Sequence, residues 1–322
     1  MIRIRFTAAD VAEVRFASRP APLQELNGAL GMMCRRDEPL LFGRWRQRLL
    51  RSLPAAVDPL ADLVPAGAAP RFLDVFDDTL QDGLETVRSA SRPTEIRSEL
   101  ERVYAGHPTP PPPWIRDLHR GDRGAWHLLR RAQHAAFEAI VRPVWPVVQD
   151  LHQTEFTRHA LTVAEHGIGT ALTRLVPGSR LHDGVWEFDA PLDRDIDLDG
   201  RGVLLLPAFH WTGHPVAAEL PGGPVGVTYP AGPGLPLAAT GPDGGEAALA
   251  AVLGRTRLDI LMLLAEEHTT SGLARRLGVS NATASAHSAA LRGAGLITTV
   301  RAGKAVLHRR TAVGSLLLQR SR

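Results

Sequence analysis

Residues 270–296 carry the sequence TSGLARRLGVSNATASAHSAALRGAGL, which decides the fold of the C-terminal part of the chain. Thr270 is predicted to be the N-cap of a helix over Ser271–Leu277, because its hydroxyl can accept a hydrogen bond from a free amide of the first turn. A tight turn, Gly278-Val279-Ser280, follows, and Ser280 caps a second helix over Asn281–Arg292. Two helices joined by so short a turn that contains glycine predict a helix-turn-helix.

The second of these helices is predicted to present two different faces. Ala284, Ser288 and Leu291 are spaced i, i+4 and i+7, so they are expected to pack together on the preceding helix. The other faces carry small polar side chains that can enter the major groove of duplex DNA. For one of these side chains, His287, a structural hydrogen bond is the alternative role.

A basic two-stranded ribbon is predicted directly after the helix pair. Leu296–Val300 and Ala305–Arg310 flank the tip, Arg301-Ala302-Gly303-Lys304, which contains the only lysine of the chain. Arginine and lysine at such a tip are expected to contact phosphate or the minor groove, which adds affinity and salt dependence but little sequence choice. The residues predicted to contact DNA are Thr270, Ser271, Arg275, Ser280, Asn281, Thr283, Ser285, His287, Arg292, Arg301 and Lys304, and for Arg275, as for Arg276, a solvated helix face is the alternative.

Charge is distributed unevenly along the chain. The 322 residues have a formal net charge of +3, but residues 246–322 contain eleven basic and four acidic side chains, a net charge of +7. Residues 1–245 therefore carry a net charge of −4. A basic segment attached to a mildly acidic one is expected when one end of a protein meets a polyanion.

These motifs resemble the ArsR family of winged helix-turn-helix regulators. The resemblance covers less than a quarter of the chain and implies a homodimer that binds palindromic operators in double-stranded DNA as a transcriptional repressor, released by a signal, and that is not an enzyme. The preceding segment is similar to that of larger, actinobacterial ArsR-like regulators. The residues that carry the resemblance are Leu273-Ala274-Arg275-Arg276-Leu277-Gly278-Val279-Ser280, Thr283, Ser285, His287, Leu291 and Ala294-Gly295-Leu296.

The chain departs from this family where the family binds metal. Metal sensors of the family carry a cysteine pair in the first helix of the motif, whereas this chain has Thr270-Ser271-Gly272-Leu273 there, and its only cysteine is Cys34. The last predicted helix, Val313–Gln319, also lacks the His and acidic ligands of the family's other zinc site. No metal and no cofactor are therefore expected. The small side chains of Ala284 and Ser288, where the family has larger apolar residues, leave the tilt of the second helix open.

Residues 1–229 are predicted to form a mostly helical α+β domain with a small sheet, a sensor or dimerisation module that residues 230–245 link to the DNA-binding domain, 246–322. Helices are expected over Ala8–Ala17, Phe72–Ser89, from Arg92, and over Asp122–Leu175 with a break at Pro143 and Pro146. Strands are expected at Ile2–Phe6, Val185–Phe188, Ile196–Leu198, Val203–Phe209 and Val225–Tyr229, with Asp199-Gly200 as a hairpin turn between two of them.

Several clusters in this first domain leave alternatives open. The proline-rich segment 107–113 is either a rigid connector or a partner motif, and the tryptophans are either core or the wall of a pocket for a small-molecule effector. A second hypothesis is that the domain is an enzyme or a metal-binding protein tethered to DNA. The histidine clusters that suggest it have solvated faces and loops as alternatives: His152, Glu155, His159 and His166 on one helical stripe, and the pairs His210 with His214 and His127 with His134.

The sequence also predicts a location. No apolar run approaches the roughly 18 residues that cross a bilayer, and Met1–Phe6 lacks the hydrophobic stretch of a secretory signal. A single cysteine excludes an intrachain disulfide and is typical of a reducing compartment. We therefore expect a cytoplasmic protein that does not contact a membrane.

Overall fold

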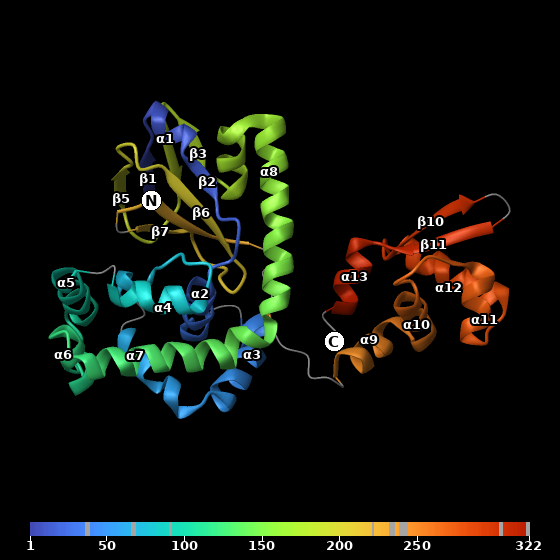
Figure 1. Ribbon diagram of the computed structural model, residues 1–322, viewed down its shortest axis with the longest axis horizontal. Helices are drawn as coiled ribbons and strands as arrows, with labels where there is room; N and C mark the ends of the chain where they lie inside the picture. Colours follow the sequence, from blue (N-terminus) through green and yellow to red (C-terminus); the bar gives the residue numbers. More distant parts are fainter. Residues whose placement is uncertain are drawn as a thin grey trace. The chain divides into compact units, whose positions relative to one another are not determined.

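The computed structural model describes residues 1–35, 39–65, 69–89, 92–220, 222–231, 236–237, 244–302 and 305–319. The chain divides into two compact units, Met1–Ala238 and Ala239–Arg322, which we call the N-terminal and the C-terminal unit (Figure 1). Most of the predicted linker and Lys304 lie outside the described residues. None of the described helices combines the length and the apolar character needed to span a membrane.

The N-terminal unit is α+β, as predicted, but contains two four-stranded sheets in place of one small sheet. Each sheet takes one strand from the first 16 residues of the chain and the others from residue 180 onward. The first sheet has the order β3-β4-β1-β5, with strands Arg180–His182, Val185–Phe188, Ile2–Arg5 and Arg194–Asp197. The second has the order β2-β6-β8-β7, with strands Val14–Phe16, Val203–Ala208, Val225–Pro230 and Val216–Glu219.

Two local predictions fail because strand pairing is not local. The helix expected over Ala8–Ala17 ends at Ala12 (α1, Ala8–Ala12), since Val14–Phe16 pairs in parallel with β6 as strand β2. The hairpin expected at Asp199-Gly200 does not form, because the strands on either side of it belong to different sheets. The two residues still make a turn with positive φ, 51° and 85°, which carries the chain from the first sheet to the second.

The helices of the N-terminal unit form a layer around an apolar core of their own. This core includes the side chains of Leu26, Leu129 and Phe137. Of the helix predicted over Phe72–Ser89, only the second half is helical, although Phe72 is buried in a short 3-10 segment. The proline-rich segment ends where Pro113 starts a helix. The helices of this layer are α2 (Pro22–Cys34), α3 (Pro39–Ser52), α4 (Leu80–Ser89), α5 (Pro93–Tyr104), α6 (Pro113–His119) and α7 (Arg123–Ala136), with 3-10 segments at Ala55–Leu63 and Arg71–Leu73.

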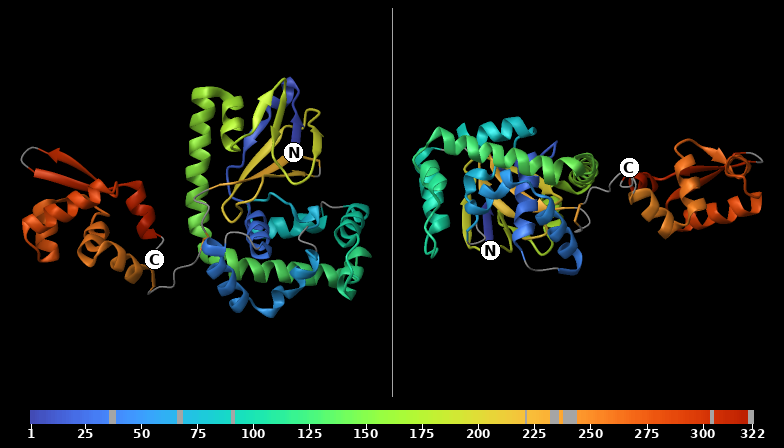
Figure 2. Two further views of the ribbon diagram at one scale, coloured as in Figure 1. Left: turned by 180° about the vertical axis from the view of Figure 1, so that it is seen from behind. Right: turned by 90° about the horizontal axis from the view of Figure 1, so that it is seen from below.

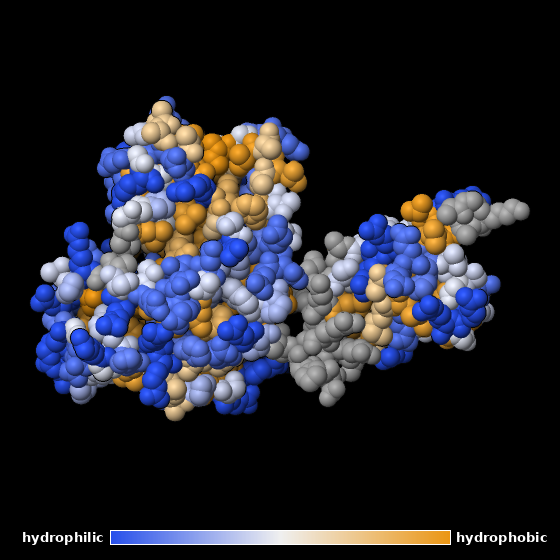
Figure 3. Space-filling view, viewed as in Figure 1, coloured by the Kyte–Doolittle hydropathy of each residue, from blue (hydrophilic) through white to orange (hydrophobic). Residues whose placement is uncertain are grey.

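The long helical stretch after residue 122 is broken at its prolines, as predicted. Helix α7 continues into a π turn, Phe137–Val141, and a 3-10 turn, Arg142–Val144, before α8 (Trp145–Leu175) begins. Gly167 adds a break that was not predicted, with a φ of 80° inside α8. Figures 1 and 2 show α8 running beside the sheets and the chain turning back after this point. Figure 3 shows apolar side chains at the surface of the N-terminal unit, in the part that contains the two sheets.

The histidine stripe of α8 is buried at two of its positions and exposed at His166. His152 and His159 are buried, so the prediction of a solvated face is wrong for them. His159 stacks on Phe16 with 4.9 Å between ring centroids, and its Nε2 lies 2.9 Å from Glu155 Oε1. Burial raises the pKa of Glu155, but hydrogen bonds from His159 and Arg158 outweigh burial and lower the pKa to about 2. Among the described residues, no group of three or more His, Cys, Asp and Glu side chains is placed to hold a metal ion.

The C-terminal unit has its own apolar core and a small sheet with the order β10-β11-β9. The two-residue strand β9 was not predicted, and it pairs with β11. The ribbon expected after the helix pair is formed by β10 and β11, which pair antiparallel from Ile297↔Arg310 to Ala302↔Ala305. The elements are α9 (Gly244–Leu253), α10 (Arg255–Leu263), β9 (His268–Thr269), α11 (Thr270–Leu277), α12 (Asn281–Gly293), β10 (Ile297–Ala302), β11 (Ala305–Arg310) and α13 (Ala312–Gln319).

Candidate nucleic-acid interface

The first helix of the pair, α11, begins one residue earlier than predicted. Thr269 is its N-cap, and the Thr269 hydroxyl accepts a hydrogen bond from the Gly272 amide at 3.0 Å. The reason is strand β9: pairing of Thr269 with Leu307 holds Thr269 in the extended conformation that an N-cap needs. Thr270 is therefore the first helical residue, and its Oγ1 lies 2.9 Å from His308 Nε2.

The turn between α11 and α12 forms as the sequence predicts. Gly278 adopts a left-handed φ of 66°, a conformation that glycine reaches without steric cost. The Ser280 hydroxyl then accepts a hydrogen bond from the Thr283 amide at 3.0 Å and caps α12. The Ser280 and Thr283 hydroxyls are also hydrogen-bonded to each other at 2.8 Å. The start of α12 is thus fixed by its own side chains.

The two faces of α12 differ as predicted. Ala284, Ser288 and Leu291 are buried, and the contacts of their face hold α12 on α10 and α11. Asn281 and Ser285 are exposed beside this packed face, whereas Thr283 and His287 are half-buried. His287 forms no hydrogen bond within the described part of the chain, so its alternative role as a structural donor has no support.

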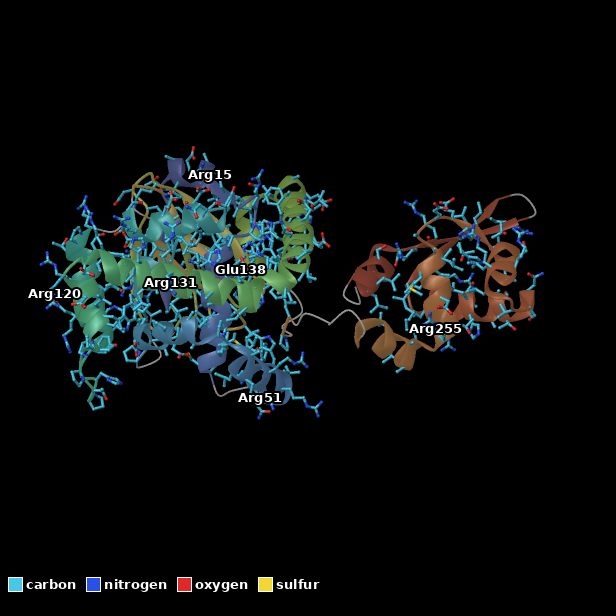
Figure 4. All side chains as sticks on the ribbon, turned by 60° about the horizontal axis from the view of Figure 1, so that its bottom comes forward. Arg15, Arg51, Arg120, Arg131, Glu138 and Arg255 are labelled. Atoms are coloured by element: carbon cyan, nitrogen blue, oxygen red, sulfur yellow. The ribbon has the colours of Figure 1, made fainter. Side chains whose placement is uncertain are left out.

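The exposed arginines of α11, α12 and β10 keep their charge available. Arg275, Arg276, Arg292 and Arg301 are exposed. Among residues 244–302 and 305–319, no carboxylate forms an ion pair with any of them. By contrast Arg255, at the start of α10 (Figure 4), pairs with Asp259 at 3.0 Å. Exposed guanidinium groups without carboxylate partners are suited to bind phosphate. The predicted contact at Lys304 lies outside the described residues.

Sequence reasoning missed His308, which joins α11 to the ribbon of β10 and β11, the wing of this domain. This buried residue of β11 lies 2.9 Å from Thr270 Oγ1 through Nε2 and 3.0 Å from Thr299 Oγ1 through Nδ1. Burial lowers the pKa of His308, and the positive charge of Arg292 lowers it further. No sequence signal indicated this role, because a strand as short as β9 has no detectable pattern.

We expect the C-terminal unit to lose stability as the pH falls below the ordinary histidine pKa of 6.5. The folded state binds the proton less readily than the unfolded state, so stability is complete above this pH and declines below it. Amide hydrogen exchange of α11 between pH 8 and pH 5 measures the effect. The His308→Gln variant keeps hydrogen-bonding groups but does not titrate, so an equally steep decline in that variant would contradict the assignment.

The comparisons with known proteins agree with this geometry. Residues 254–299 match the family model described as "Bacterial regulatory protein, arsR family", a range that begins just before α10 and ends within β10. No match was found among curated proteins or among solved structures. The family model thus covers the helix pair and the first strand of the wing. The C-terminal unit carries an ArsR-type helix-turn-helix, which indicates DNA-binding transcription regulation.

Proposed function

We propose that the protein is a homodimeric repressor that binds palindromic operators in double-stranded DNA. One observation carries the proposal: α12 exposes Asn281 and Ser285 at the edge of its packed face, and the exposed arginines of α11, α12 and β10 have no carboxylate partner among the described residues. A helix of this kind can enter a major groove with its N-terminal residues at the base edges. An asparagine amide in that position can pair with adenine through two hydrogen bonds.

Each remaining polar residue has a role that follows from its position. Arg275 and Arg292 bind the phosphates on the two sides of the groove, together with the exposed hydroxyls of Ser271 and Ser280 at the helix starts. Arg301 and Lys304 of the wing bind the flanking backbone. Thr270 acts indirectly, since its hydroxyl is engaged with His308 and fixes α11 against the wing.

Exposed apolar side chains support the homodimer. Val252 of α9 is 80% exposed and Val313 of α13 is 60% exposed. Removing such side chains from water stabilises association. In a two-fold dimer the two copies of α12 face half-sites about 34 Å apart, one turn of the duplex. Repression is the role that the resemblance to the ArsR family implies.

Selection of duplexes from a randomised pool by the purified full-length protein tests the proposal. The expected result is an inverted repeat with half-sites about one turn apart. The double variant Asn281→Ala, Ser285→Ala should lose roughly 10- to 1,000-fold of the preference for the selected sequence and keep non-specific binding. The variant Gln153→Ala, Thr157→Ala removes an amide and a hydroxyl at the same spacing on α8 and serves as the control.

Three results would overturn parts of this proposal. Absence of any enriched sequence, or enrichment unchanged by the α12 variant, would show that α12 does not read bases. Enrichment of one unrepeated site would show that the protein binds as a monomer. Reporter transcription from the selected site, raised on deletion of the gene, is the result expected of a repressor.

A further inference from the structure

The N-terminal unit contains a cavity whose walls come from α2, the 3-10 segments and the second sheet. Its volume is about 340 Å³, within the range of small-molecule sites in proteins. Most of its wall is apolar, from side chains that include Leu30, Leu60, Leu63, Leu73 and Trp211. The cavity therefore has the size and the character of a site for a compact hydrocarbon group.

The mouth of the cavity is marked by exposed apolar side chains. Leu192 and Val216 line it, yet they are 64% and 40% exposed. Side chains that line a cavity and also face solvent place its opening at the surface. Leaving such side chains in water costs free energy, which an apolar ligand at the mouth recovers.

One carboxylate stands in this apolar wall. Asp74 lines the cavity, and Gln24 Nε2 donates a hydrogen bond of 3.4 Å to its Oδ1. Asp74 Oδ2 accepts no hydrogen bond among the described residues, although the side chain keeps some accessible surface. Burial raises the pKa of Asp74 to about 6. The carboxylate is thus held in a poorly solvated place with an oxygen left to accept from a ligand.

Two arginines, Arg71 and Arg102, line the cavity but form no ion pair with Asp74 among the described residues. Arg102 donates to Glu99 at 2.8 Å and to the Ala69 carbonyl at 2.8 Å, and Arg71 lies 3.9 Å from Glu99. Both arginines line the cavity and their charges act on Asp74, but their side chains are paired with Glu99, so the Asp74 carboxylate still has an oxygen free to accept from a ligand.

Trp211 contributes its indole ring to the wall, and one cation of the chain already lies over this ring. Its indole Nε1 donates to the His214 carbonyl at 2.8 Å, and the guanidinium of Arg35 lies 5.4 Å from the ring centroid. The electron-rich face of an indole stabilises cations in this way. Cys34, the only cysteine of the chain, lines the same cavity with an exposed side chain.

We propose that this cavity binds a compact apolar organic cation, whose ammonium or amidinium N–H groups donate to Asp74 and whose hydrocarbon part packs between the leucines and Trp211. The Asp74 carboxylate is a negatively charged acceptor, and an ammonium group supplies the N–H donors and the positive charge that complement it. The remaining volume takes an alicyclic or aromatic group. This binding site does not depend on the proposed recognition of DNA by the C-terminal unit, since all of its residues belong to the N-terminal unit.

The rate of Cys34 alkylation by a maleimide in the full-length protein provides the test. Two probe sets are used: 1-adamantylamine, 1-adamantanol and 1-adamantanecarboxylic acid, and the smaller benzylamine, benzyl alcohol and benzoate. At least one amine is expected to slow labelling more than fivefold, while its alcohol and acid analogues have little effect. Asp74→Asn should weaken amine protection at least tenfold, and Asp78→Asn, an exposed aspartate four positions away that does not line the cavity, should leave it unchanged.

Several outcomes would overturn the proposal. Equal protection by amine, alcohol and acid would show a pocket that selects only for apolar surface. Stronger protection by the acids would assign the site to anions bound by Arg71 and Arg102. Protection that survives Asp74→Asn, or no protection by either probe set, would also reject it. The labelling rate of each variant without probe shows whether the cavity is intact.

Discussion

Replacing Arg275, Arg292 and Arg301 together by alanine is expected to weaken binding to any duplex DNA by roughly 100- to 1,000-fold near 0.15 M salt. Each guanidinium that contacts a phosphate releases counterions on binding, and the homodimer carries two copies of each arginine, so the negative slope of log K against log salt should become less steep by about 5.4. The effect should be nearly the same for all sequences, because phosphate contacts carry no sequence information. Titration of labelled duplexes at several salt concentrations measures both quantities.

A matched control separates these contacts from a general effect of charge. Arg44, Arg48 and Arg51 lie on α3 of the N-terminal unit, and Figure 4 labels Arg51 there. Their replacement by alanine removes the same charge and should leave both affinity and salt slope close to those of the unaltered protein. If the two triple variants lose affinity equally, the arginines around α12 are not the phosphate contacts.

Gly202→Ala is expected to destabilise the N-terminal unit by about 3 kcal/mol or more. Gly202 has a φ of 69°, and an added Cβ would lie 2.5 Å from both the Cβ and the carbonyl oxygen of Glu13. Its amide also donates to Asp10 Oδ1 at 3.0 Å, a bond that a shift of the backbone would break. All six tryptophans lie in this unit, so urea unfolding followed by tryptophan fluorescence reports on it alone.

Gly200→Ala is the control for this prediction. Gly200 also has a positive φ, 85°, but an added Cβ would meet nothing within 4 Å. Its replacement should cost only the backbone strain, roughly 1 to 2 kcal/mol. The difference between the two variants isolates the close approach of β6 to the end of α1. Equal losses would mean that Glu13 moves aside freely.

The helix-turn-helix was predictable because its signals are local. The caps at Ser280 and the glycine at 278 act within one turn, and the spacing of Ala284, Ser288 and Leu291 fixes which face is buried. The error at Thr270 has the opposite origin. The conformation of Thr269 depends on its pairing with Leu307, a residue far along the chain. Local patterns thus predicted both helices, whereas pairing with a distant strand determines where the first helix begins.

The N-terminal unit was less predictable because its contacts join distant segments. The turn at Asp199-Gly200 has the local chemistry of a hairpin, but β6 pairs with β2 and β8, so the hairpin does not form. Similarly, the spacing of the histidines on α8 suggested an open face or a metal site. His159 is buried because Phe16, from the start of the chain, stacks on it. Periodicity shows which residues share a face, but not what covers that face.

The candidate sites differ in the same way. Exposure of Asn281 and Ser285 followed from the helical repeat, so most of the proposed DNA contacts could be named from the sequence. The cavity around Asp74 could not, because its wall combines residues from Gln24 to Thr228. A buried aspartate among apolar residues becomes apparent only when those segments are brought together.

The position of strands β1 and β2 has a consequence for synthesis of the protein. Both lie in the first 16 residues, while the strands that pair with them begin at residue 185 and beyond. At ordinary translation rates these strands wait roughly 10 to 40 s on the ribosome for partners. During that interval their unpaired backbone edges are open to other chains. The yield of folded protein should therefore depend on whatever shields these first residues, and a pause in translation before residue 185 should increase aggregation.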